Sequence, residues 1–144
     1  MDLRLSLQFA DPRHRESLSR HFVRRCLART LQAPAELTVR WVDEDEMRAL
    51  NHQYRHKDYP TNVLTFAYQN APAVEADIVL CPAVIEREAR EQHKTLQAHY
   101  AHMLVHAVLH AQGFEHETDD EAQAMQTLEQ AVMARLGFDD PYAA

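Results

Sequence analysis

The sequence predicts a single α+β domain in which about five helices pack on a small mixed sheet of four strands. The chain has 144 residues, which suffices for one ordinary domain with a hydrophobic core. Segments that alternate polar and apolar residues are interspersed with segments whose apolar residues recur at helical spacing. The resulting order is β-α-β-α-β-β-α-α-α, and such a mixture is typical of helices packed on a small mixed sheet.

The first third of the chain gives two strands separated by a helix. Residues 3–9, LRLSLQF, alternate with period two and are predicted to form a strand. A helix is predicted over residues 12–30, with Asp11 as its N-cap and Pro12 in the first helical position. Residues 36–42, ELTVRWV, alternate again and are predicted to form the second strand.

The middle of the chain gives a helix, two strands and another helix. Residues 44–55 are predicted to form a short helix, because Asp43 begins a capping box there. Residues 61–68, TNVLTFAY, are predicted to form a strand. Residues 76–81, ADIVLC, are almost uniformly apolar and are predicted to form an internal strand. Proline then opens a charged helix over residues 82–92.

The last third is predicted to be helical. Residues 96–112 carry apolar side chains at helical spacing, and Gly113 is placed to end this helix in a left-handed conformation. Thr118 and Glu121 form a capping box for a final helix, which Gly137 ends. The whole of residues 1–144 is therefore expected to be one domain.

Composition restricts the kinds of site that the chain can hold. Cys26 and Cys81 are far apart, which argues against a disulfide framework and against a thiolate zinc site. No apolar run is long enough to span a bilayer, and the first residues lack a signal-peptide core, so a cytoplasmic location is expected. Any metal must be held by histidine or carboxylate.

The charge is unevenly distributed along the chain. The net charge is −7, yet residues 1–60 carry 11 basic and 9 acidic residues, while residues 61–144 carry 4 and 13. An acidic total therefore does not exclude a basic face. We expect basic residues to line one groove and the acidic residues 115–121 and 139–140 to face away from it. The basic residues are Arg13, Arg20, Arg24, Arg55 and Lys57.

The stretch VHAVLHAQGFEHE, residues 105–117, holds the strongest chemical signal. His106 and His110 lie one helical turn apart, and a chain reversal at Gly113 would bring His116 back toward them. Three imidazole ligands leave a fourth position for water, which is the ligand count of a catalytic zinc site. The alternative is a His-rich helix that binds nothing, since the chain has ten histidines.

Two chemistries are compatible with these ligands. The spacing matches the zinc-peptidase pattern H-E-x-x-H-x-x-G-x-x-H, but Ala107 stands where the general base should be. Glu115 and Glu117 do not occupy that helical position. Phosphodiester cleavage instead requires a fixed positive charge for the transition state, and Arg55 in a predicted loop before a strand is the best candidate.

Several segments resemble the YbeY family, bacterial endoribonucleases of ribosomal RNA maturation. HAVLHAQGFEH resembles the signature H-G-x-L-H-L-x-G-Y-D-H, and NHQYRHKDYPTNVLTF resembles N-x-x-Y-R-x-K-D-x-P-T-D/N-V-L-S-F. ADIVLC and TDDEAQAM resemble two further family segments, so that the resemblance covers roughly residues 40–142. Ala107, Ala111, Phe114 and Glu115 depart from the signature, but no histidine of it is missing.

The resemblance implies a function and a set of site residues. It makes His106, His110 and His116 the zinc ligands, and makes Arg55 the catalytic or substrate-positioning arginine. One Zn²⁺ per chain is expected, with Ni²⁺ as a possible substitute, because three imidazoles suit both metals. The groove of basic residues is expected to bind RNA and to lead to this metal. It implies a single-strand-specific, metal-dependent endoribonuclease in small-subunit ribosomal RNA 3′-end maturation and ribosome quality control. Expected partners are single-stranded ribosomal RNA, the small ribosomal subunit, one of its proteins and the GTPase Era. A zinc peptidase without its usual base and a non-catalytic ribosome-assembly factor with a structural metal site are the alternatives.

Overall fold

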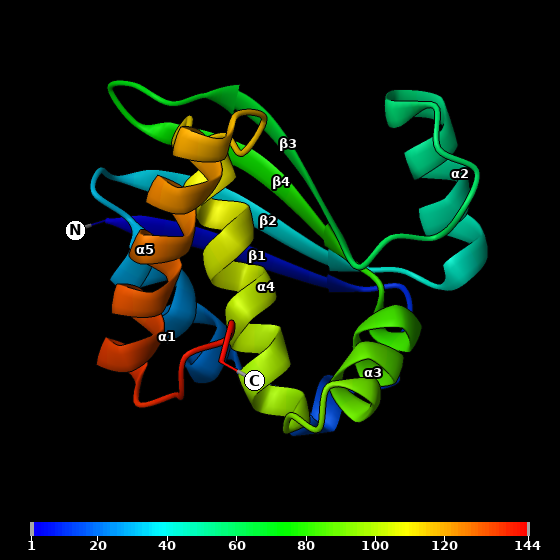
Figure 1. Ribbon diagram of the computed structural model, residues 1–144. Helices are drawn as coiled ribbons and strands as arrows, with labels where there is room; N and C mark the ends of the chain where they lie inside the picture. The colour runs from blue at the N-terminus through cyan, green and yellow to red at the C-terminus, as the bar shows by residue number, and fades with distance from the viewer. Residues whose placement is uncertain (1, 144) are drawn as a thin grey trace.

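A mixed four-stranded sheet forms the framework of the computed structural model, which describes residues 2–143 (Figure 1). Strands β1 (Leu3–Phe9), β2 (Ala35–Trp41) and β4 (Val74–Leu80) are parallel. Strand β3 (Val63–Gln69) lies antiparallel to β4 at one edge, which gives the order β1-β2-β4-β3. The predicted fold class is confirmed, and β4 is internal as expected, although it begins two residues earlier than predicted.

Five α-helices in the described part of the chain pack on one face of this sheet and near the ends of its strands. Helices α1 (Arg20–Thr30), α4 (Leu96–Ala111) and α5 (Asp119–Leu136) cover one face (Figure 1). Helices α2 (Glu44–Arg55) and α3 (Pro82–Glu91) lie near the carboxyl ends of the parallel strands (Figure 1). Within residues 2–143, no helix is long and apolar enough to cross a membrane.

Helix α4 lies at the centre of the packing. It contacts α1, α3, α5, β3 and β4, and nearly every residue from His99 to Ala111 is buried. Two of its histidines, His99 and His102, are buried, because Glu88 of α3 and Glu129 of α5 cover them and pair with them.

Capping residues define the start of α4 and both ends of α5. The Thr95 hydroxyl accepts a hydrogen bond from the backbone N–H of Ala98 at the start of α4. Thr118 and Glu121 form the predicted capping box of α5. Gly137 ends α5 in the left-handed conformation, with φ +90°. The signals at Thr118 and Gly137 were interpreted correctly from sequence alone.

The start of α1 differs from the prediction. The chain forms only a 3₁₀ turn at Arg15–Ser17 and begins α1 at Arg20, whereas a continuous helix was expected from residue 12. The break occurs because Leu18 adopts an extended conformation that buries its side chain in the core. Ser19 is the N-cap, and its hydroxyl accepts from the Phe22 N–H at 3.0 Å.

This capping arrangement gives a testable difference between two nearby serines. Ser19→Ala should lower the free energy of unfolding by about 1 kcal/mol, because it leaves a helix N-terminal donor without its partner. Ser17→Ala is the matched control, because Ser17 is exposed and its hydroxyl makes no hydrogen bond within residues 2–143. Urea unfolding of both variants checks the prediction, and equal stabilities would contradict it.

Candidate metal centre

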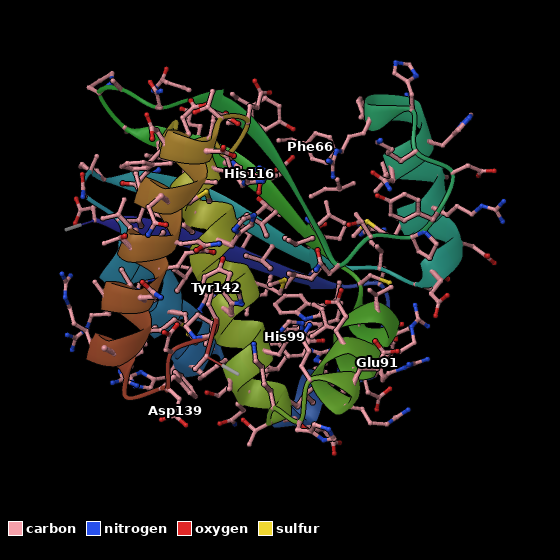
Figure 2. The ribbon with its side chains drawn as sticks, in the orientation of Figure 1. Phe66, Glu91, His99, His116, Asp139 and Tyr142 are labelled. Atoms are coloured by element: carbon pink, nitrogen blue, oxygen red, sulfur yellow. The ribbon has the colours of Figure 1, made fainter. Side chains whose placement is uncertain are left out.

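The carboxyl end of α4 and the connection to α5 bring three histidines together. His106 and His110 project from the last turns of α4. Gly113 has φ +100°, and its N–H bonds the His110 carbonyl at 2.9 Å, so the helix ends in the left-handed turn predicted from sequence. One ring nitrogen from each of His106, His110 and His116 lies within 4.8 Å of the others. Figure 2 shows His116 above the end of α4, next to β3 and β4.

Hydrogen bonds fix which nitrogen of each helical histidine faces the centre. His106 Nδ1 lies 2.8 Å from Glu129 Oε1, and His110 Nδ1 lies 2.9 Å from the Phe114 carbonyl oxygen. A carboxylate and a carbonyl only accept, so both Nδ1 atoms carry the proton and donate. In a neutral ring, the proton is then absent from Nε2, which leaves both Nε2 lone pairs available as ligands.

These two lone pairs face one another. His106 Nε2 and His110 Nε2 are 3.1 Å apart, with no proton between them when both rings are neutral. Two ligands in a tetrahedral zinc site, each about 2.0–2.1 Å from the ion, are separated by about 3.3 Å. The arrangement is repulsive for the two imidazoles alone and fits a divalent cation, and the all-nitrogen ligand set is one that zinc accepts.

The environment keeps His110 in the neutral form that a metal requires. Burial and, after it, the nearby His106 and His116 rings, which disfavour a further positive charge, together lower the pKa of His110 to about 4. At neutral pH the ring is therefore unprotonated without the help of a metal.

Glu129 of α5 is a site residue that the sequence analysis missed. It is 1% exposed, and its carboxylate accepts hydrogen bonds from His102, His106 and Tyr142. Burial would raise the pKa of Glu129, but these three hydrogen bonds outweigh burial and lower it to about 2. Glu129 occupies a position within the buried stripe of α5, between Met125 and Val132. A charged residue inside an apolar helical stripe was the signal that could have identified it.

A cavity of about 500 Å³ opens beside the histidines. One wall is the start of the edge strand β3 with the residues before it, from Thr61 to Thr65, and Arg55 also lines the cavity. Arg55 is the last residue of α2, as the predicted helix over residues 44–55 has it, and the loop in which it was also expected begins only at the left-handed His56, with φ +59°. The structure thus places Arg55 and the three histidines on one cavity.

The expected charge distribution around this cavity is only partly correct, because Arg55 lines the cavity but the other four basic residues do not. Arg13 instead pairs with Glu86 at 3.1 Å and Arg20 hydrogen-bonds the Leu5 carbonyl, and neither they nor Arg24 line the cavity. The acidic residues Glu115 and Glu117 were expected to face away but form part of the wall. They do so because the reversal at Gly113 that delivers His116 also delivers its two neighbours.

Comparison with known proteins gives the family. The model of the family described as endoribonuclease YbeY matches residues 6–137. A protein named endoribonuclease YbeY from Methylibium petroleiphilum is 58% identical over 141 residues, covering 98% of this chain and 95% of that protein. The chain belongs to the endoribonuclease YbeY family. The endoribonuclease YbeY of Albidiferax ferrireducens is also 58% identical, covering 97% of each chain.

A solved structure agrees with the fold at low sequence identity. A protein from Thermotoga maritima, known from a solution structure, superimposes with a TM-score of 0.55 and 23% identity, covering 99% of each chain. This similarity shows the fold alone. The extension of the YbeY resemblance over nearly the whole chain, including most of the predicted first strand and the predicted first helix, rests on the family model and the relatives.

The low pKa of His110 predicts how acid affects the metal-free protein. Between about pH 6.5 and pH 4 the unfolded chain protonates His110 and the folded chain does not, so acidification lowers the free energy of unfolding. His110→Gln removes this group and should lose less stability between about pH 7 and pH 5 than the parent does. Urea unfolding in the presence of EDTA measures both losses. Equal losses in parent and variant would show that His110 titrates normally in the folded state.

Proposed function

We propose that this chain is a single-strand-specific, metal-dependent endoribonuclease that acts on ribosomal RNA in small-subunit 3′-end maturation and ribosome quality control. Membership of the endoribonuclease YbeY family makes it a hydrolase of RNA phosphodiester bonds. The proposed metal dependence is supported by the cluster of three histidines in the wall of a cavity that Arg55 also lines.

One Zn²⁺ per chain is proposed at His106, His110 and His116. Support comes from the facing Nε2 atoms of His106 and His110 and from the neutral state of His110. Three protein ligands leave a fourth position toward the cavity, as in catalytic rather than structural zinc sites. When bound, zinc supplies a Lewis acid at that position. Ni²⁺ fits the same three imidazoles, so purified protein is expected to carry either metal.

Arg55 is proposed as the catalytic residue that binds the reacting phosphate. Arg40, Arg48 and Arg87 are engaged in ion pairs with carboxylates, whereas Arg55 has no such partner within residues 2–143. Its guanidinium is therefore available to a phosphate, which it can bind through two parallel N–H groups. A positive charge held there stabilises the extra negative charge of the transition state.

The position of β3 supports a single-stranded substrate. Among the strands of residues 2–143, β3 pairs only with β4, so its other edge, which borders the cavity, presents peptide groups without a strand partner there. Unstacked bases of single-stranded RNA offer their edges to such donors and acceptors, whereas paired bases do not.

The partners, location and extent of the domain are proposed from the family resemblance. They comprise the small ribosomal subunit, one of its proteins and the GTPase Era, with action in the cytoplasm by a single domain over residues 1–144. The acidic total charge favours delivery of the RNA by such partners, because Glu115 and Glu117 reduce the attraction of the cavity for phosphate.

The two alternatives are less well supported. Ala107, at the position of a peptidase's general base, is fully buried, and its carbonyl faces the Thr65 hydroxyl at 3.4 Å. A purely structural metal would require a closed site, yet the histidines line an open cavity.

The metal ligands are tested by removing one of them. His110→Ala should abolish stoichiometric zinc, because two imidazoles rarely hold the ion alone. Elemental analysis of protein purified without a His tag measures the content. A full equivalent of metal in the variant would place the ion elsewhere.

The role of Arg55 is tested by comparing substitutions of two arginines. Arg55→Ala should retain the metal and lower single-stranded RNA cleavage by about 10²–10³-fold, since one contact to transition-state charge is lost. Arg55→Lys should also be slow, because a point charge replaces a planar fork. Arg87→Ala removes the same charge from α3, outside the cavity, and serves as control.

RNA cleavage rates and the metal content of all three variants are measured together, with casein as a second substrate. Unchanged rates of RNA cleavage in both Arg55 variants would show that Arg55 is a surface residue without a role in catalysis. Hydrolysis of casein with no cleavage of RNA would favour the peptidase alternative.

A further inference from the structure

The carboxylate of Glu129 connects the metal centre to the segment that follows α5. Its Oε1 accepts from His106 Nδ1 at 2.8 Å and from His102 Nε2 at 3.1 Å, and its Oε2 accepts from the Tyr142 hydroxyl at 2.5 Å. Figure 2 shows Tyr142 lying over α4, between that helix and α5. Three donors from two separate parts of the chain therefore converge on one buried side chain.

The Tyr142 side of this cluster is held firmly. Lys94 donates to the Pro141 carbonyl at 2.5 Å, and Gln130 donates to the Asp140 carboxylate at 3.1 Å. The Asp140 carboxylate also accepts from the Tyr142 N–H at 2.9 Å. The tyrosine ring packs edge-on against His102, with centroids 5.2 Å apart. The Tyr142 hydroxyl is thus directed toward Glu129 by a turn that several hydrogen bonds hold in place.

A purely structural role does not explain all of this geometry. An ionised carboxylate is costly to bury, and any three donors would satisfy it. Here the shorter of the two contacts between Glu129 and a histidine is the one to His106 Nδ1. The other nitrogen of that ring, Nε2, faces His110 Nε2. A carboxylate that accepts from one imidazole nitrogen fixes the ring orientation and tautomer and increases the basicity of the other nitrogen.

We propose that Glu129 is a positioning residue that holds His106 with Nε2 toward the metal, and that Tyr142 in turn holds Glu129, so that zinc affinity depends on the segment 139–143. This inference rests on the proposed metal site. It adds to that site a dependence on side chains that contact neither the ion nor the RNA.

A second cavity makes the Tyr142 hydroxyl important. About 230 Å³ of space lies behind His106 and His116 and is also lined by Glu129 and Tyr142. Water entering this space competes for the carboxylate when the hydroxyl is missing. The carboxylate is then free to turn away from His106, and the imidazole loses its fixed orientation.

The first experiment compares the parent with Glu129→Gln, which preserves size and removes the charge. Zinc affinity, measured by competition with a chromophoric chelator, should weaken by about 10–100-fold. In metal-free protein labelled with ¹⁵N-histidine, NMR should show His106 protonated on Nδ1 in the parent. The Nε2-protonated form should increase in the variant, because the introduced amide can donate to Nδ1.

The second experiment keeps Glu129 and removes one hydroxyl. Tyr142→Phe should weaken zinc binding less than Glu129→Gln does, but measurably. Tyr68→Phe is the matched control, because the Tyr68 hydroxyl also donates to a carboxylate, Asp77 Oδ2 at 2.7 Å, and does not line either cavity beside the histidines. Its zinc affinity should equal that of the parent.

The outcomes separate this inference from the proposed function. Zinc affinity equal to the parent in both Glu129→Gln and Tyr142→Phe, with an unchanged His106 tautomer, would overturn the inference and leave Glu129 a structural residue. A parent that binds no zinc would overturn the proposed metal site. The tautomer measurement needs no metal and still tests Glu129 in that event.

Discussion

Burial of α4 is the constraint on which the rest of the structure depends. This helix packs against two strands and three helices, and its residues from Tyr100 to Val105 are all buried. Interiors are packed as densely as organic crystals, so a helix enclosed in this way has one position and one rotation. The rotation that buries the apolar side chains also decides where each histidine of α4 lies.

The four histidines of α4 show how one helix provides both structure and chemistry. Near its start, His99 is paired with Glu88 of α3, and His102 is paired with Glu129 of α5. At its end, only the Nδ1 atoms of the two remaining rings are paired, and their Nε2 atoms stay open toward the cavity. The possible ligands are precisely placed because the helix that carries them is also the helix that packs at the centre of the core.

The sequence predicted those features that depend on local patterns. The spacing of His106 and His110, the left-handed turn at Gly113 and the capping box at Thr118 are set by residues a few positions apart. The features it missed depend on distant partners. The predicted first helix is interrupted because the Leu18 side chain is buried in the core. The buried Glu129 is stabilised by a hydrogen bond from His106, 23 residues away. The acidic wall of the cavity follows from the path of the chain rather than from total charge.

The three histidines come from a single stretch of 11 residues, and this has a consequence for how a metal relates to the fold. A cation bound there would cross-link only neighbouring turns of chain, and the entropy cost of closing a loop grows only with the logarithm of its length. Hydrogen bonds from Gly113 and Phe114 back to α4 already close this loop. Unlike a zinc finger, whose folding waits for its ion, a chain whose loop is already closed in this way would not need to unfold to release and reload a metal at the proposed site.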